Sequence, residues 1–201
     1  MKLYGHPFSN AARRVQMLCE ECSIPYTYQV VNLMEGEQYK PEFLALNPNG
    51  KVPVIDDDGF VVWESQAIMR YLADKHKAKT WYPVDPRARA HVDAWLDWNQ
   101  TRLGPEAAKI MFNTHFAGDK GNPAAIEDAK KWLLKILPMM DGELKQRKYL
   151  CGDQPTVADI AAATNLAYLE MCQYDLGTYP AVTKWFGGMK ARPSFTKTIP
   201  K

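Results

Sequence analysis

The sequence lacks the features that define several large classes of protein. No apolar run in its 201 residues approaches the roughly 18 that a membrane-spanning helix needs. Its first five residues do not begin the extended apolar region of a signal peptide. Four Cys are too few for a scaffold held by disulfides, so free thiols in a reducing compartment are expected. These absences predict a soluble, cytoplasmic protein without a membrane partner.

An excess of one charge sign is also missing. The chain has 25 Lys and Arg against 23 Asp and Glu, which gives a formal net charge of +2. Proteins that bind the phosphates of nucleic acid usually carry a larger basic excess, so no nucleic-acid partner is expected. With 46% hydrophobic and 24% charged residues, the composition is typical of a globular protein with a buried core.

The first part of the chain alternates strand and helix signals. Short apolar runs between turn residues predict strands, and apolar residues three and four apart predict helices. The predicted strands are residues 2–5, 26–31, 52–55 and 60–63, and the predicted helices lie around 15–22, 41–46 and 67–76. A helix joins the first two strands, which makes them parallel, whereas a Gly-containing turn makes the last two a hairpin.

The second half of the chain contains helix signals but no convincing strand. Three long segments repeat apolar residues with a period near 3.6. The third begins at Thr156, and Asp159 completes a capping box with Asp in place of Glu. The sequence therefore predicts an α/β domain over residues 1–76, a linker over 77–85 and an all-α domain over 86–201.

Cys19 and Cys22 form a C-x-x-C motif, which beside a β-α-β pattern can mark thioredoxin-type redox chemistry. That chemistry needs a Cys at the positively polarised start of a helix, where its pKa falls. These two lie deep inside a predicted helix, on its apolar face and beside two Glu residues. We therefore expect buried, unreactive thiols. The chain offers no spacing typical of a metal site, so no metal is expected.

Three predicted turns place polar or unusual residues at one end of the strands. Ser9 and Asn10 follow the first strand, and Glu64 and Ser65 follow the last. Each pair can bind a ligand at the exposed N–H groups of the next helix, or simply cap that helix. Pro53 interrupts a strand pattern, either as a cis-Pro that exposes backbone groups or as a trans-Pro at a strand start. Together the turns predict a binding cleft.

The same segments resemble glutathione S-transferases of the serine-using theta, phi and delta type. The motifs that carry the resemblance are KLYG at 2–5, Ser9, RV at 14–15, PEFL at 41–44, NPNGKVPV at 47–54, ESQAI at 64–68 and YL at 71–72. It continues in WYP at 81–83, AR at 88–89, Val92 and Trp95, which are most similar to the theta class, and in TVADI at 156–160. The resemblance covers nearly the whole chain.

This resemblance implies a thioredoxin-like first domain joined to an all-α domain, assembled as a homodimer. It implies an enzyme of detoxification, a glutathione transferase that stabilises the thiolate of glutathione for attack on small hydrophobic electrophiles. Glutathione is the implied co-substrate, bound mainly by the first domain. Two alternatives stay open: a glutathione-dependent dehalogenase or isomerase, and a non-catalytic glutathione-binding module.

The resemblance also implies which hydroxyl is catalytic. Ser9 corresponds to the serine that hydrogen-bonds the glutathione sulfur, with Asn10 as the second choice. Asn10 stands where beta-class members have a Cys that forms a mixed disulfide with glutathione, so disulfide chemistry is disfavoured. Gly5 stands where mammalian-type members have a catalytic Tyr, and Tyr4 is expected to point to the opposite face of the strand.

The resemblance implies that two further segments bind the γ-glutamyl and cysteinyl parts of glutathione. Val52 would offer its backbone N–H and C=O beside a cis-Pro53. Glu64 and Ser65 match the pair that binds the γ-glutamyl amine and carboxylate.

The remaining implied contacts lie at the glycyl end and at the electrophile. The charge of Lys51 suits the glycyl carboxylate. Gln38 replaces a His that contacts the glycyl end in many relatives, so this contact is either kept by the Gln amide or lost. Arg102 lies near the position of a theta-class Arg that approaches glutathione. The electrophile is expected between the domains, against Phe112, His115 and Phe116 together with Met111, although a Met and Phe stripe at helical spacing is more often core.

Overall fold

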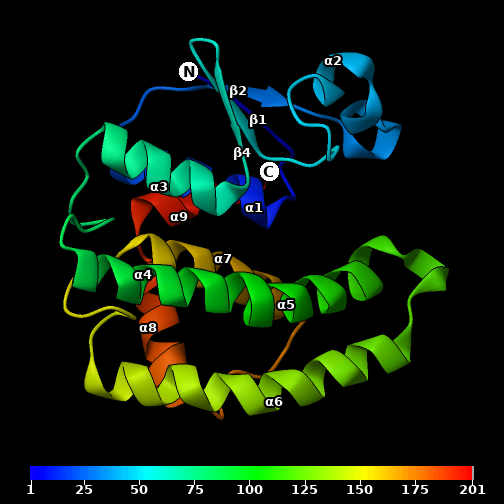
Figure 1. Ribbon diagram of the computed structural model, residues 1–201. Coiled ribbons are helices and arrows are strands. Elements are labelled where there is room, and N and C mark those ends of the chain that lie inside the picture. The colour runs from blue at the N-terminus through cyan, green and yellow to red at the C-terminus, as the bar shows by residue number, and fades with distance from the viewer. Residues whose placement is uncertain (201) are drawn as a thin grey trace. The chain divides into compact units, whose positions relative to one another are not determined.

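The computed structural model describes residues 1–200 and divides into two compact units (Figure 1). The first unit contains Met1–Tyr82 together with the chain from Arg192 onward, and the second contains Pro83–Ala191. The first is a four-stranded sheet with helices, and the second is helical, as the sequence predicted. Among residues 1–200, none of the helices combines the length and apolar character that crossing a bilayer demands.

The first unit follows the predicted β-α-β-β-β-α order, with the additional short helix expected over residues 41–46 present between β2 and β3. Its strands are β1 (Lys2–Gly5), β2 (Thr27–Val30), β3 (Val54–Asp57) and β4 (Phe60–Trp63). Its helices are α1 (Asn10–Glu21), α2 (Pro41–Leu44), α3 (Ser65–Lys75) and α9 (Pro193–Lys197), with 3-10 turns at Leu33–Glu35 and Glu37–Tyr39. Residues 41–46 therefore give a helix of little more than one turn.

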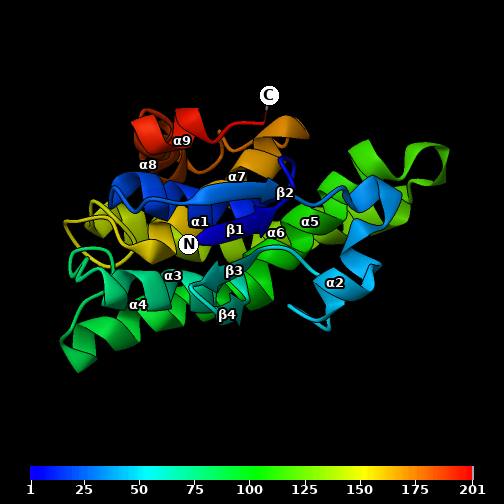
Figure 2. The same cartoon turned by 90° about the horizontal axis from the view of Figure 1, so that it is seen from above.

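The sheet has the order β2-β1-β3-β4, which Figure 2 shows from above. β1 is parallel to β2 and antiparallel to β3, and β3 is antiparallel to β4. The hairpin turn is tighter than predicted: it consists of Asp58 and Gly59, whose φ angles of 56° and 92° match a two-residue turn with both φ positive.

The two faces of the sheet are covered by different elements. Leu3 and Ile55 are fully buried on the face that α1 and α3 cover. On the opposite face Tyr4 meets Phe43 of α2 edge to face, with ring centroids 6.4 Å apart. Tyr4 thus points away from α1, as strand alternation predicted. Gly5 faces α1, and a Cβ there would lie 2.8 Å from the Cβ of Ala12, which leaves no room for a side chain.

The second unit is a bundle of helices. These are α4 (Pro86–Trp98), α5 (Gly104–Met111), α6 (Pro123–Gln146), α7 (Val157–Met171) and α8 (Pro180–Lys190), with π turns at Asn99–Leu103 and Phe112–Phe116 and a 3-10 turn at Gly118–Lys120. The capping box at the start of α7 is present. Its Asp159 is fully buried and also accepts hydrogen bonds from the Leu150 N–H and the Trp185 indole, both at 3.0 Å. The cap therefore also fixes α8 and the preceding loop.

The chain from Arg192 onward was expected in the all-α domain but packs on α1 of the first unit. Glu21 at the end of α1 accepts two hydrogen bonds from Arg192, at 2.6 and 2.7 Å, and one from Ser194 at 2.5 Å. Arg13 donates to the Phe195 carbonyl at 3.0 Å and lies 4.0 Å from the centroid of the Phe195 ring. These contacts join residues about 170 or more positions apart, which the local pattern could not reveal.

The ion pair between Glu21 and Arg192 is expected to make stability depend on pH. Burial alone would raise the pKa of Glu21, but hydrogen bonds from Arg192 and Ser194 outweigh it and hold the pKa below its ordinary value. A lowered carboxyl pKa contributes stability above the unfolded value, about 4.3, and that contribution is lost as the pH falls through the folded value.

Arg192→Met should therefore lower the free energy of unfolding by about 1.5–3 kcal/mol at pH 7, measured by urea denaturation. The difference from the unmodified protein should shrink as the pH falls below about 4.3 and through the lowered pKa of Glu21. Lys197→Met is the matched control, because its amine pairs with Glu20 at 3.1 Å on the surface, and it should change stability by less than about 0.5 kcal/mol. A pH-independent effect of Arg192→Met would contradict the electrostatic explanation.

Candidate functional site

The hydrogen-bonded register brings three segments of the first unit to one edge of the sheet. Tyr4 of β1 lies opposite Val54 of β3, and Val54 lies opposite Trp63 of β4. Because β3 runs against both neighbours, the chain leaves β1 and β4 and enters β3 at the same edge. We name the residues that follow or precede these strand ends, Ser9, Val52, Pro53, Glu64 and Ser65, the polar edge.

Ser9 is the N-cap of α1. Its backbone is extended, with φ −85° and ψ 109°, and its Oγ accepts a hydrogen bond from the Ala12 N–H at 3.2 Å. The capping alternative is thus present in the structure. A hydroxyl carries one donor and two acceptor lone pairs, so accepting from Ala12 leaves the Ser9 O–H able to donate elsewhere. Capping and thiol activation are therefore compatible in this side chain, and Asn10 next to it is the first residue of α1.

The Val52–Pro53 peptide bond is cis, one of the two geometries that the sequence left open. Pro53 is buried and Val52 is partly exposed. The carbonyl of Lys51 accepts a hydrogen bond from the Asn47 side chain at 2.8 Å, so the loop before β3 is tied to the end of the α2 region. The Lys51 side chain itself is exposed.

Glu64 and Ser65 open α3, but they differ in environment. Glu64 is exposed and has φ 69° and ψ 111°, a backbone conformation that costs a residue other than Gly about 1–3 kcal/mol. Ser65 is buried, and its Oγ accepts a hydrogen bond from the buried Arg14 guanidinium at 3.3 Å. Arg14 had no role assigned from the sequence beyond its place in a motif. The structure shows that it links α1 to the start of α3 and brings positive charge to the polar edge.

Gln38 lies in the 3-10 turn between β2 and α2. It is buried, and its Nε2 donates to the Leu33 carbonyl at 3.4 Å. Its Oε1 is buried without a hydrogen-bond partner among the described residues. The same segment packs against the loop before β3, because a Cβ on Gly50, at φ 60°, would lie 3.2 Å from the Gln38 carbonyl.

The C-x-x-C thiols are poor candidates for chemistry. Burial is the main cause that raises the pKa of Cys19 to about 12 and that of Cys22 to about 11. Both are therefore protonated at neutral pH, and Cys22 is the C-cap of α1 rather than its start. Within residues 1–200, no three His, Cys, Asp or Glu side chains converge in a way that could coordinate a metal ion.

The other predicted site residues belong to the second unit. Arg102 lies on the π turn after α4, is exposed, and lines a pocket of about 200 Å³ with Trp132 of α6. Phe112 and Phe116 lie on the π turn after α5 and are 58% and 43% exposed, so they are not core residues. The His115 Nε2 lies 3.3 Å from the Met171 carbonyl.

Met111, by contrast, is buried in the helical core, 2% exposed, with its sulfur 3.7 Å from the Cys172 Sγ. The core interpretation of this apolar stripe therefore fits Met111 but not Phe112 or Phe116.

Comparison with known proteins identifies both halves of the chain. Residues 8–75 match the N-terminal domain of glutathione S-transferases, and residues 89–193 match their C-terminal domain. Glutathione S-transferase D7 of Drosophila melanogaster is 31% identical over 198 residues, covering 98% of this chain and 85% of that protein. Glutathione S-transferase GstB of Escherichia coli is 30% identical, covering 98% of this chain and 96% of that protein.

Solved structures agree with these matches. Poplar glutathione transferase F1 superimposes with a TM-score of 0.93 at 29% identity, over 98% of this chain and 95% of that one. A glutathione transferase family member from Pseudomonas fluorescens, solved with two glutathione bound, superimposes with a TM-score of 0.90 at 26% identity, over 99% and 92%. The thioredoxin-like fold of the first unit and the helical second unit are those of this family.

The raised pKa values of Cys19 and Cys22 predict slow alkylation of the folded protein. At pH 7.5 a thiol of pKa about 11 should have a thiolate fraction at least 100-fold below that of a free Cys of pKa about 8.5. Iodoacetamide should therefore modify both residues at least 100-fold more slowly than a Cys peptide, measured by mass spectrometry. The urea-unfolded protein is the control and should react at the peptide rate. Rapid modification of folded Cys22 would restore a redox role for the motif.

Proposed function

The chain belongs to the glutathione S-transferase family, and we propose that its polar edge activates the thiol of glutathione for attack on small hydrophobic electrophiles. The observation that carries this proposal is the convergence of a Ser hydroxyl, a cis-Pro loop and a second helix start at one edge of the sheet. Glutathione requires three features of a binding site: a hydrogen-bond donor for its sulfur, backbone groups that pair with its peptide part, and a site for its charged ends.

Ser9 acts on the thiol as a hydrogen-bond donor, not as a nucleophile. The glutathione thiol resembles a free Cys of pKa about 8.5, and lowering that pKa by about two units requires roughly 2.7 kcal/mol. A hydrogen bond to a charged group contributes about 1.5–3 kcal/mol. The N-terminus of α1 adds about 0.3–1 kcal/mol, up to roughly 2 where partly buried. Ser9 at the N-cap supplies both effects, with Asn10 as the second candidate donor.

The start of α3 binds the γ-glutamyl end. The Glu64 carboxylate faces solvent and pairs with the amine, while Ser65 and the first N–H groups of α3 receive the carboxylate. Because Arg14 donates to Ser65 Oγ, the Ser65 proton is directed away from Arg14 and toward a bound anion. The buried guanidinium also favours negative charge at this position.

The loop before β3 binds the rest of the tripeptide. Val52 pairs its backbone N–H and C=O with the cysteinyl part, and the exposed Lys51 meets the glycyl carboxylate. Gln38 replaces a common His at the glycyl end, where its buried Oε1, which has no partner among the described residues, can accept from an N–H but cannot bind the carboxylate. In the second unit, Arg102 approaches glutathione, and Phe112, His115 and Phe116 receive the electrophile; the two exposed Phe rings support that assignment.

The wider setting is a detoxifying enzyme of theta-like type that works as a cytoplasmic homodimer. Retention of Ser9 supports the serine-using type. Phe60 and Trp63 on the edge strand β4 are 56% and 42% exposed, and a second copy would cover this apolar surface. Thiols whose pKa values are raised by burial are compatible with a reducing compartment.

Ser9→Ala should lower turnover of glutathione with chlorodinitrobenzene at least tenfold near pH 7, because the thiolate loses its donor. The activity that remains should rise with pH toward the pKa of free glutathione, measured as kcat/KM from pH 6 to 9. Ser9→Thr, which keeps the hydroxyl, should retain most activity.

Ser9→Asp separates capping from catalysis. An Asp caps α1 as well as Ser does, but it offers no donor at neutral pH. This variant should fold normally and be inactive. Turnover of Ser9→Ala within twofold of the unmodified enzyme from pH 6 to 8 would transfer the role to Asn10 or to backbone N–H groups.

Glu64 offers a test of binding and of backbone strain in one position. Glu64→Gly and Glu64→Ala both remove the carboxylate, so both should raise the KM for glutathione about tenfold with a smaller effect on kcat. Only Gly relieves the positive φ, so it should be about 1 kcal/mol more stable than Ala, measured by urea denaturation. An unchanged KM in both variants would remove Glu64 from the glutathione site.

A further inference from the structure

Strand β2 forms one outer edge of the sheet, and the proposed glutathione chemistry does not use it. In the order β2-β1-β3-β4 it has a neighbouring strand on one side only. Thr27, Gln29 and Val30 are exposed, which is three of its four residues. Edge strands are often protected by Lys, Pro or inward-pointing charges. The TYQV sequence of β2 contains none of these, so the edge is open to pairing.

The backbone of β2 offers hydrogen-bonding groups on its outer side. In a strand, successive residues direct their N–H and C=O groups to opposite sides. The Val31 N–H donates to the Gly5 carbonyl at 2.8 Å, so the backbone groups of Val31 and Gln29 face β1. Those of Tyr28 and Val30 therefore point outward, and among residues 1–200 they meet no backbone partner there. An extended peptide can add to the sheet at this edge.

A pocket of about 410 Å³ lies beside this edge, between β2 and α2. We name it the β2 pocket. Its apolar lining consists of Tyr4, Val31, Phe43 and Leu46, which belong to one hydrophobic cluster. Gln29 also lines the pocket and lies opposite Tyr4 in the register, so both side chains point to the face of the sheet away from α1. The pocket can therefore receive a side chain from a peptide paired with β2.

The charged residues of the β2 pocket are Glu37, Lys40 and Glu42. The Glu37 carboxylate is already engaged, because it accepts from the Lys40 amine at 3.0 Å and from the Asn32 N–H at 2.8 Å. Glu42 is exposed and forms no ion pair with any residue of the described 1–200. A cation entering the pocket would therefore meet the free carboxylate of Glu42, although the chain as a whole has a formal net charge of +2.

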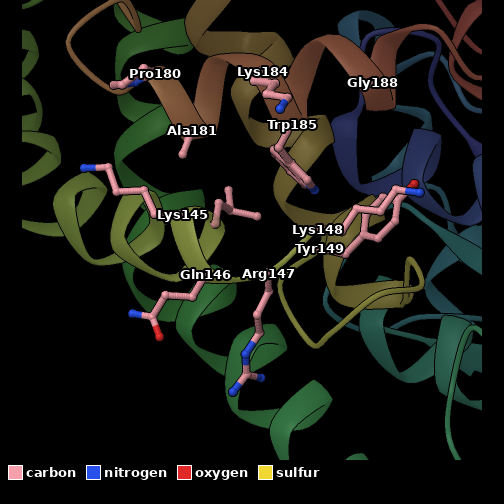
Figure 3. A pocket seen from close by; sticks show the side chains of 11 residues that line it. Lys145, Gln146, Arg147, Lys148, Tyr149, Pro180, Ala181, Lys184, Trp185 and Gly188 are labelled. Carbon is pink, nitrogen blue, oxygen red and sulfur yellow. The ribbon is translucent and has the colours of Figure 1, made fainter.

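A second pocket carries the opposite charge. It has a volume of about 670 Å³ and is formed by the end of α6, the loop that follows it, and α8 (Figure 3). Its aromatic lining is Tyr149 and Trp185, and none of the described residues that line it is acidic. Its four cations are Lys145, Arg147, Lys148 and Lys184. This cationic pocket repels a basic ligand, whereas the β2 pocket attracts one.

We propose that β2 binds an extended peptide that carries an Arg side chain, and that the peptide adds to the sheet as an outer strand. Its backbone pairs with the outward N–H and C=O groups of Tyr28 and Val30. Its guanidinium enters the β2 pocket, packs on the ring of Tyr4 and pairs with Glu42. Backbone pairing supplies affinity, and the pocket selects the side chain. None of these residues belongs to the polar edge, so binding does not require the glutathione chemistry.

The probe is a capped heptapeptide of alternating Thr and Val with Arg at its centre, labelled with fluorescein. Its binding is measured by fluorescence anisotropy, with S-hexylglutathione in excess to occupy the glutathione site. The dissociation constant should be below about 0.1 mM. The same peptide with Glu at its centre should bind at least tenfold more weakly, because its carboxylate would face Glu42.

Two N-methylated versions of the probe test the strand geometry. Methylation of alternate backbone nitrogens removes the N–H groups from one side of an extended peptide. Because one side faces β2 and the other faces solvent, one version should bind at least tenfold more weakly and the other within threefold of the unmethylated probe. Both versions keep the Arg and the same charge, so a difference between them reports backbone pairing.

Variants of the protein test the same two contacts. Val30→Pro removes an outward N–H without removing a bond to β1, and it should weaken binding at least tenfold, whereas Val30→Thr keeps that N–H and should bind within threefold. Glu42→Gln should weaken binding at least fivefold. Its matched control is Glu35→Gln, an exposed acid of the same region that does not line the β2 pocket. Thermal unfolding midpoints verify that each variant is folded.

Four results would overturn the proposal. One is a dissociation constant above 1 mM for the probe with the unmodified protein. Another is equal binding by the two methylated versions, which would indicate a site for a small organic cation rather than for a strand. The third is equal binding by Glu42→Gln and Glu35→Gln. The fourth is a smaller assembly of Val30→Pro in sedimentation, which would assign this edge to a second copy of the chain.

Discussion

The antiparallel pairing of β3 with both β1 and β4 is the constraint on which the rest of the first unit depends. It places Tyr4, Val54 and Trp63 in one row across the sheet. Every segment that leaves or enters the sheet beyond this row must then emerge at the same edge. Residues that are more than 50 positions apart in sequence, such as Ser9 and Ser65, therefore mark helix starts at the same edge of the sheet. A one-residue slip of β3 would reverse which side chains face the core.

Helix α1 connects this edge to the rest of the unit. Its first cap is Ser9, its buried Arg14 reaches Ser65 on α3, and its last residue, Glu21, binds the tail through Arg192. The absence of a side chain at Gly5 lets this helix lie close to β1. The position of the Ser9 hydroxyl thus depends on packing along the whole helix and on contacts from the far end of the chain.

The two units place their charges differently. In the first, the exposed Glu64 precedes α3, and the buried Arg14 of α1 donates to the next residue, Ser65, so charges of opposite sign lie near the start of that helix. In the second, cations such as Lys148 and Lys184 surround an aromatic hollow that no carboxylate of the described residues lines. A nearly neutral total charge conceals this separation, because the sum over a sequence says nothing about where its charges lie.

The sequence by itself determined the order of strands and helices, the change to an all-α second half, and the capping box at Thr156 and Asp159, because these follow from local periodicity and local hydrogen bonding. It also predicted the burial of Cys19 from its place on the apolar face of a helix. Only the tertiary structure decided between the cis and trans forms of Pro53, the burial of Gln38, the link from Arg14 to α3, the attachment of the tail to α1 and the cationic pocket. Each of these depends on contacts between residues far apart in the chain, and no local pattern encodes which distant partner a side chain will meet.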